Sequence, residues 1–188
     1  YENKGKGADG NYVFEEVNVA DKSGNRMGIY PIYNDTDGGR SRQWVSVGDY
    51  DKDGYLDIVV TGRDDYEDAD GMEDGNVLVH HDRRAVYLYK NDKGKRFIRQ
   101  ETPLNGTDPF LGLARGSVYF ADMDNDGWLD IVSSGYGPNE GNLHVYWNNG
   151  DGTFSETGQH FYGSYDSSCA LGDLNADGYV DIVVTGYS

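Results

Sequence analysis

The segment GDYDKDGYLDIVVTG (residues 48–62) places four aspartates within nine positions, directly before a short run of β-branched residues. Carboxylates crowded at the mouth of a buried strand repel one another and resist the loss of water, so the arrangement indicates a positively charged partner. The pattern returns in ADMDNDGWLDIVSSG (residues 121–135) and in GDLNADGYVDIVVTG (residues 172–186). This repeated unit of an acidic loop and a hydrophobic strand decides the fold.

The spacing of the acidic residues fits a loop that binds calcium. Side-chain oxygens at positions 1, 3, 5 and 9 and a backbone carbonyl at position 7 supply the oxygen cage that a hard cation needs, and a glycine at position 6 allows the sharp turn. Magnesium prefers a tighter octahedron, and transition metals favour His or Cys, which all three loops lack. We therefore predict three Ca²⁺ sites. Their expected ligands are Asp49, Asp51, Asp53, Tyr55 and Asp57; Asp122, Asp124, Asp126, Trp128 and Asp130; and Asp173, Asn175, Asp177, Tyr179 and Asp181.

Two other interpretations fit these loops less well. A metal-free Asp-Gly turn accounts for one such loop, but three copies in identical register argue against it. An EF-hand begins with the same pattern but needs a Glu at position 12 and a helix on each side. Position 12 is Val60, Ser133 or Val184, and the residues after each loop have the β-branching of a strand.

The composition restricts the classes of partner. The 188 residues suffice for one ordinary domain, and the formal net charge of −17 makes nucleic acid and anionic membranes poor partners. A single cysteine, Cys169, excludes an internal disulfide and is expected to be a small core residue. No apolar stretch is long enough to insert into a membrane. Because such loops bind calcium at extracellular concentrations, we expect a secreted or cell-surface protein, extracellular or periplasmic.

Each complete repeat contains four predicted strands. A hairpin carries the acidic loop at its tip, and a second hairpin follows at residues 85–98 and 143–155, with Asn and Gly at its turn. Repeated four-stranded units of this size are typical blades of an all-β propeller. We expect residues 1–17 to be the end of a blade, 44–99 and 117–157 to be full blades, and 169–188 to be the first half of a blade.

The sequences LDIVVTG, LDIVSSG and VDIVVTG after the loops resemble FG-GAP repeats of the VCBS type, and VYLYKNDKGKRF and VYWNNGDGTF resemble the second half of that repeat. This family includes the integrin α-subunit propeller and many secreted bacterial proteins. The resemblance implies that the chain is a segment, about three blades' worth, of a seven-bladed β-propeller stabilised by calcium. It implies little about function, because the family includes adhesion receptors, lectins and polysaccharide-degrading enzymes.

Two functional classes stay open at this stage. The first and favoured one is a recognition module, for cell adhesion or carbohydrate binding, that takes an extracellular glycan or protein. The second is a polysaccharide lyase or glycoside hydrolase built on the propeller, although no catalytic set has a convincing spacing. Long connections are expected on the face opposite the calcium loops, which makes that face the candidate binding surface. Its candidate residues are Tyr30, Tyr33, Arg63, Tyr66, Arg83, Tyr136 and Tyr162.

Overall fold

The computed structural model describes residues 2–9, 11–15, 19–20, 44–64, 83–137, 141–156 and 161–187. The described residues form strands, turns and loops, and contain no helix. Correspondingly, no described segment is a helix of the length and apolarity needed to cross a membrane.

The first large sheet is built around the first acidic loop. Its antiparallel strands follow the order of the chain: β4 (Trp44–Gly48), β5 (Asp57–Asp64), β6 (Arg83–Asn91) and β7 (Phe97–Gln100). The two-residue strand β3 (Val19–Ala20) lies parallel to β7 at the edge of this sheet. The acidic loop joins β4 to β5, so it lies at one end of the sheet.

The second large sheet repeats this arrangement. It contains β8 (Ala114–Ala121), β9 (Asp130–Tyr136), β10 (Gly141–Asn148) and β11 (Phe154–Glu156), again antiparallel and in chain order. The short strand β12 (Phe161–Tyr162) pairs with the beginning of β10. The second acidic loop joins β8 to β9, in the same position as the first loop.

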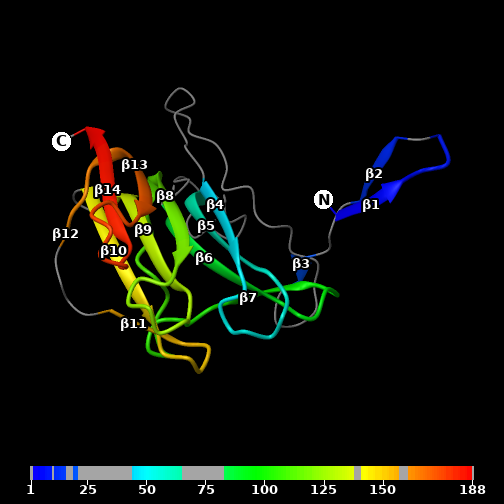
Figure 1. Ribbon diagram of the computed structural model, residues 1–188, viewed down its shortest axis with the longest axis horizontal. Helices are drawn as coiled ribbons and strands as arrows, with labels where there is room; N and C mark the ends of the chain where they lie inside the picture. The colour runs from blue at the N-terminus through cyan, green and yellow to red at the C-terminus, as the bar shows by residue number, and fades with distance from the viewer. Residues whose placement is uncertain are drawn as a thin grey trace, which may run out of the picture.

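Two smaller sheets complete the described structure. β13 (Tyr165–Gly172) pairs with β14 (Asp181–Tyr187), and the third acidic loop joins them. β1 (Glu2–Lys6) and β2 (Tyr12–Glu15) form a separate two-stranded sheet (Figure 1). The turn between β1 and β2 is held by the Gly7 amide, which donates to the carbonyl of Asn11 at 2.8 Å.

The core lies between sheets that are stacked face to face. The first two large sheets enclose one cluster, which also takes in Phe110 and Leu113 from the segment before β8. A second cluster fills the space between the second large sheet and β13–β14, where Val132 and Val145 pack against Leu171. Cys169 is buried in β13, as predicted. The first cluster consists of Tyr50, Val59, Val86, Leu88, Phe110, Leu113, Val118, Ile131, Tyr146 and Phe154.

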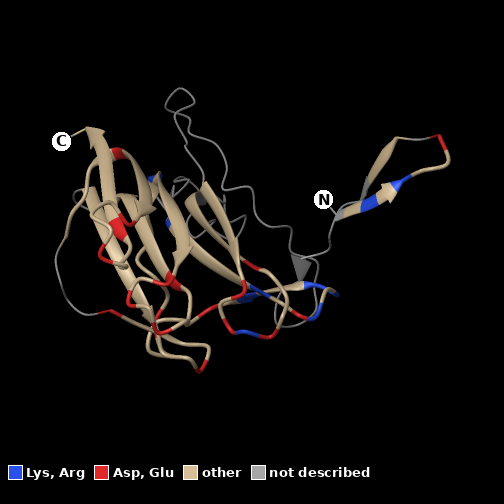
Figure 2. Cartoon of the chain, viewed as in Figure 1, with Lys and Arg blue, Asp and Glu red and all other residues tan. Residues whose placement is uncertain are grey.

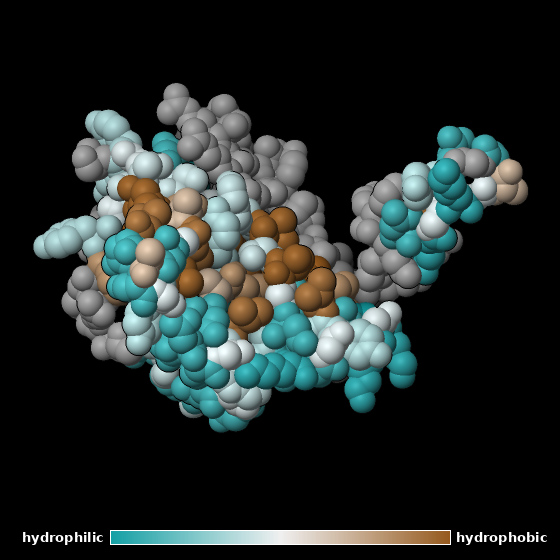
Figure 3. Space-filling view, viewed as in Figure 1, coloured by the Kyte–Doolittle hydropathy of each residue, from teal (hydrophilic) through white to brown (hydrophobic). Residues whose placement is uncertain are grey.

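The close approach of neighbouring sheets explains the small residue at the end of β4. A Cβ atom on Gly48 would lie 2.7 Å from Leu129 Cδ1 and 3.0 Å from Phe120 Cδ2. On the other side of β4, hydrophobic side chains gather at the surface (Figure 3), where Val45 and Val47 are 59% and 58% exposed. Repeated antiparallel sheets stacked in this way are blades, so the prediction of an all-β propeller segment is confirmed.

Candidate metal centres and the opposite face

The three acidic loops occupy equivalent positions, because each joins the first two strands of its sheet. Figure 2 shows acidic residues in the loops at this end of the sheets. The glycine at position 6 has a positive φ in every copy: 88° at Gly54, 86° at Gly127 and 91° at Gly178. Glycine adopts this conformation without the steric cost of a Cβ atom, which explains its position in the pattern.

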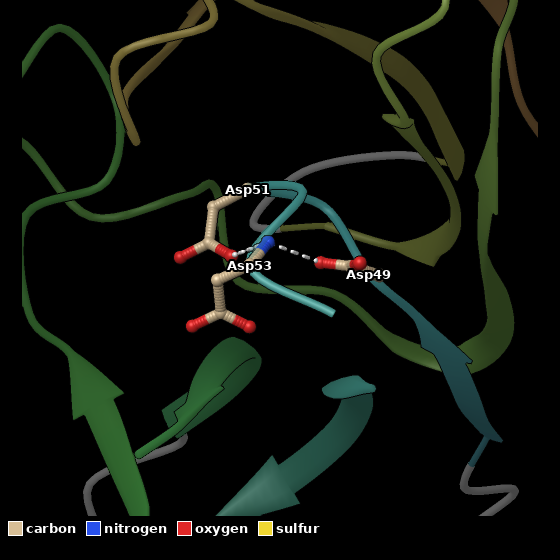
Figure 4. A group of neighbouring side chains, drawn as sticks. All are labelled: Asp49, Asp51 and Asp53. Carbon is tan, nitrogen blue, oxygen red and sulfur yellow. Dashed lines mark hydrogen bonds between the residues drawn. The ribbon is translucent and has the colours of Figure 1, made fainter. Parts of the chain in front are cut away.

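The first loop folds its carboxylates around its own backbone. The Asp53 amide donates to Asp49 Oδ1 at 3.0 Å and to Asp51 Oδ1 at 3.3 Å (Figure 4). The Gly54 amide donates to Asp49 Oδ2 at 2.9 Å. One oxygen from each of the three aspartates lies within 4.8 Å of the others, which is close enough for all three to bind one ion.

The second loop repeats this geometry. Asp126 and Gly127 donate amide hydrogen bonds to Asp124 Oδ1 and Asp122 Oδ2 at 3.2 and 2.9 Å. Here the group of three oxygens within 4.8 Å comes from Asp122, Asp124 and Asp130. The second oxygen of Asp122, Oδ1, is buried and has no hydrogen-bond partner among the described residues. An orphaned carboxylate oxygen at the centre of an acidic loop fits a cation ligand.

The third loop has the same backbone pattern with weaker acidic character. The Gly178 amide donates to Asp173 Oδ2 at 2.9 Å, and the Asp177 amide donates to Asn175 Oδ1 at 2.9 Å. The amide nitrogen of Asn175 also donates to Asp177 Oδ2 at 3.0 Å. Within the described residues 173–181, no three carboxylates lie as close together as those of the other loops.

The aspartate at position 9 is held from two directions in both large sheets. Asp57 Oδ2 accepts from the Tyr50 amide at 3.1 Å, and its Oδ1 accepts from the Asn91 amide at 2.8 Å. In the second sheet, Asp130 is bonded in the same way by the amides of Met123 and Asn148, at 2.9 and 2.8 Å. Asp57 is 0% and Asp130 1% exposed.

Burial changes the acidity of these two carboxyl groups. Loss of water raises the pKa of Asp57 to about 7 and that of Asp130 to about 6, although the two backbone donors on each carboxylate act in the opposite direction. Neighbouring carboxylates of the same loop raise both values further. A cation bound in either loop would offset this loss of water and this repulsion.

The sequence did not reveal the role of the asparagine that ends the third strand of each large sheet. The side-chain nitrogen of Asn91 donates to the Leu56 carbonyl at 3.0 Å, and that of Asn148 donates to the Leu129 carbonyl at 3.0 Å. Both carbonyls belong to position 8 of the acidic loop. The only sequence signal is the Asn at the start of the NDKGK and NNGDG turns, a position where Asn is also common as a turn residue.

Lys90 is a second unpredicted neighbour of the first loop. Its ammonium group forms an ion pair with Asp51 Oδ2 and lies 3.7 Å from Asp53 Oδ2. The corresponding residue of the second large sheet is Trp147. The first loop thus has an internal cation beside its carboxylates.

The ends of the strands opposite the acidic loops carry Tyr and Arg side chains. The Arg84 guanidinium lies over the Tyr136 ring, 4.3 Å from its centroid, and the rings of Tyr136 and Tyr165 are 5.1 Å apart. The Tyr162 side chain is fully exposed in β12. We call Arg84, Tyr136 and Tyr165 the aromatic row; Arg84 and Tyr165 were not among the predicted binding residues.

The other predicted binding residues are only partly described. The backbones of Arg63 and Arg83 lie at this same end, near the end of β5 and the start of β6. Tyr30, Tyr33 and Tyr66 lie outside the described residues.

Comparisons with known proteins agree with the repeated loops and sheets. A family model described as "FG-GAP-like repeat" matches residues 68–133 and 122–184. Integrin alpha-6 of Gallus gallus is 33% identical over 154 residues, with 77% of this chain and 13% of the relative covered. Integrin alpha-6 of Homo sapiens is 31% identical over 149 residues, with 77% of this chain and 12% of the relative covered. The chain thus spans about an eighth of the length of these relatives.

A solved structure of an Agrocybe aegerita lectin that recognises non-reducing terminal N-acetylglucosamine is also similar. It has a TM-score of 0.43 and 22% sequence identity, with 76% of this chain and 33% of that chain covered. The family assignment does not depend on it, because the two matches of the family model cover more than half of the chain. The chain belongs to the family of FG-GAP-like repeat proteins.

Proposed function

We propose that this chain is part of an extracellular, calcium-stabilised β-propeller that recognises a glycan or a protein on the face opposite the calcium loops. Calcium is proposed for all three loops with the ligands predicted from the sequence. The metal serves the structure in this proposal, because it lies at the tips of the hairpins and neutralises carboxylates that the fold buries. The orphaned Asp122 Oδ1 is the single observation that best supports it.

The aromatic row supports recognition on the opposite face. Tyrosine offers a flat apolar ring with a polar tip, and arginine offers several donors, so both are frequent where a protein binds a partner. The contacts among Arg84, Tyr136 and Tyr165 hold these side chains in fixed relative positions, which lowers the entropy lost on binding. The likeness to integrin alpha-6 is consistent with recognition outside the cell.

Binding to an array of immobilised glycans and extracellular proteins tests the face assignment. The probe for the variants is any glycan or protein that the unmodified chain binds. We expect Tyr136→Ala and Tyr165→Ala each to weaken its binding by about tenfold, the usual effect of losing an anchoring aromatic side chain. Tyr179→Ala is the matched control, because Tyr179 is 55% exposed on the third acidic loop at the other end of the sheets, and the substitution keeps the backbone carbonyl that is its predicted metal ligand. The face assignment fails if both Tyr136→Ala and Tyr165→Ala bind as the unmodified chain does, or if Tyr179→Ala weakens binding as much as they do.

A further inference from the structure

Asn148 is bonded to two neighbouring acidic loops at once. Its side-chain nitrogen donates to the Leu129 carbonyl of the second loop at 3.0 Å and to the Tyr50 carbonyl of the first loop at 2.8 Å. Asn148 is only 7% exposed, so these bonds form in a site where an unpaired amide would be costly. Its side-chain oxygen accepts from the Gly150 amide at 2.9 Å, which fixes the orientation of the side chain.

These hydrogen bonds complete a path from a predicted ligand of the first metal site to a predicted ligand of the second. Asp57 Oδ2 accepts from the backbone amide of Tyr50, and the backbone carbonyl of Tyr50 accepts from the side chain of Asn148. The backbone amide of Asn148 then donates to Asp130 Oδ1. The position-9 carboxylates of the first and second loops are thus joined through the backbone of Tyr50 and one asparagine.

Tyr50 is itself fixed between the two sheets. It is 2% exposed, its ring is stacked on that of Phe120, with 6.3 Å between centroids, and it also contacts the ring of Phe154. A shift of the Tyr50 backbone would therefore disturb both sheets. Because closely packed interiors have few alternative arrangements, the position of Asp57 and that of Asp130 cannot change independently.

A second contact joins the same two loops at the surface. The Lys52 ammonium group lies 4.0 Å from the centroid of the Trp128 ring, and Trp128 is the position-7 residue of the second loop. Lys52 has a φ of 58°, so the first loop adopts a left-handed conformation where it reaches its neighbour. Lys52 is exposed and Trp128 is half-buried, which makes this contact the weaker of the two links.

Asn91 provides a comparison within the same chain. It bonds the Asp57 carboxylate and the Leu56 carbonyl of its own loop, as Asn148 does for Asp130 and Leu129. Among the hydrogen bonds of the described residues, its side-chain nitrogen has no second carbonyl in another acidic loop. Asn91 therefore positions one loop, whereas Asn148 positions two.

We propose that Asn148 is a positioning residue that couples the first and second metal sites, so that a cation bound at one site strengthens binding at the other. The inference rests on the metal binding proposed above. Binding at the first site fixes Asp57 and, through Tyr50, the side chain of Asn148. The second site then binds a cation with Asp130 already held in place. The conformational entropy of the two loops is therefore lost mainly in the first binding step. The effect is reciprocal, as linkage requires.

Terbium provides a probe that is weighted toward the second site. Tb³⁺ is a hard cation that takes oxygen ligands, and the indole of Trp128, at position 7 of the second loop, sensitises the luminescence of an ion bound there most directly. Asp51→Asn weakens the first site and keeps the Oδ1 acceptor for the Asp53 amide. We expect this change to weaken Tb³⁺ binding at the second site about fivefold, the value of one hydrogen bond. In the Asn148→Ala background, the same change should have less than a twofold effect.

Asn149→Ala is the matched control for Asn148→Ala. Asn149 is the next residue along the chain, is exposed, and bonds Thr153 and Ser155 within its own turn. In its background the fivefold effect of Asp51→Asn should be retained. Asp51→Asn also removes a charge, which weakens cation binding at the second site by a long-range Coulomb effect. Asn148→Ala leaves that effect unchanged, so the difference between the two backgrounds measures the coupling through the Asn148 hydrogen bonds alone.

The possible outcomes distinguish this inference from the proposed function. An unchanged second-site affinity in Asp51→Asn overturns the coupling, and this result can be obtained even if Asn148→Ala does not fold. A fivefold effect that persists without Asn148 also overturns the role of this residue. A chain that binds neither Tb³⁺ nor Ca²⁺ overturns the proposed metal sites themselves, and the coupling with them.

Discussion

Asp57 and Asp130 are the residues of the acidic loops whose ionised side chains are most destabilised by burial. Both carboxyl groups are buried, and their pKa values of about 7 and about 6 lie above the usual 3.8. A raised pKa in the folded state means that the native protein binds the proton more tightly than the unfolded chain does. Without metal, these groups favour folding most below pH 4, and that contribution is lost as the pH rises through 6 and 7.

Calcium should reverse this pH dependence. Only the ionised carboxylate binds the cation, so protons and calcium compete for Asp57 and Asp130. We expect the difference in melting temperature between calcium-loaded and metal-free protein to be full at pH 8 and to fall by at least half at pH 5.5. Scanning calorimetry on both forms across this range measures it. A difference that stays constant from pH 8 to pH 5 would contradict the assignment of these two residues as ligands.

Lys90 should give the first metal site a lower calcium affinity than the second. Its ammonium group is bonded to Asp51, which raises the pKa of Lys90 and keeps it charged. A cation entering the loop must displace this group or bind beside it. We expect Lys90→Gln to increase calcium affinity at the first site by up to about fivefold, because partly exposed ion pairs contribute about 1 kcal/mol or less.

Calorimetric titration with calcium measures this change. Lys95→Gln is the control, since Lys95 is exposed in the same β6–β7 turn and its loss changes the net charge equally. If both variants raise the affinity to the same degree, the effect comes from net charge rather than from the Asp51 ion pair.

At the scale of the element, the unit of loop and strand could be predicted from the sequence because its determinants are local. The Asp and Gly positions of residues 49–57 specify the loop by spacing alone, and the β-branched residues after them specify β5. The same reasoning predicted the β6–β7 and β10–β11 hairpins from Asn and Gly at their turns. Each of these features involves residues fewer than about fifteen positions apart.

The contacts that connect elements could not be predicted in this way. Asn148 and Tyr50 are 98 residues apart, and Lys90 and Asp51 are 39 apart. The row of Arg84, Tyr136 and Tyr165 likewise joins β6, β9 and β13. Such pairs depend on the register in which neighbouring sheets stack, and residue spacing along a single sequence does not determine that register. Strand order predicted that Tyr136 and Tyr162 lie at the end opposite the acidic loops, but not that Tyr136 contacts Arg84 and Tyr165.

At the scale of the whole molecule, the proposed calcium ions act on a chain with a net charge of −17. Any salt reduces the repulsion among so many carboxylates, so a general ionic effect must be separated from binding at the loops. Specific binding to the native state stabilises it by mass action, by about 1.4 kcal/mol for each site when calcium is tenfold above its dissociation constant. Three sites together would contribute about 4 kcal/mol by the same relation.

Removal of calcium should therefore lower the melting temperature by about 10 °C, given the size of the chain. Scanning calorimetry with and without a chelator measures the shift, and elemental analysis of the untreated protein gives the metal content. Sodium chloride at equal ionic strength is the control for screening; it should recover little of the loss, whereas added calcium should recover all of it. Asp130→Asn should reduce the shift by more than one third, because it removes a ligand of one site in three and also weakens the coupled first site. No shift on chelation, together with no metal in the elemental analysis, would refute calcium stabilisation for the whole molecule.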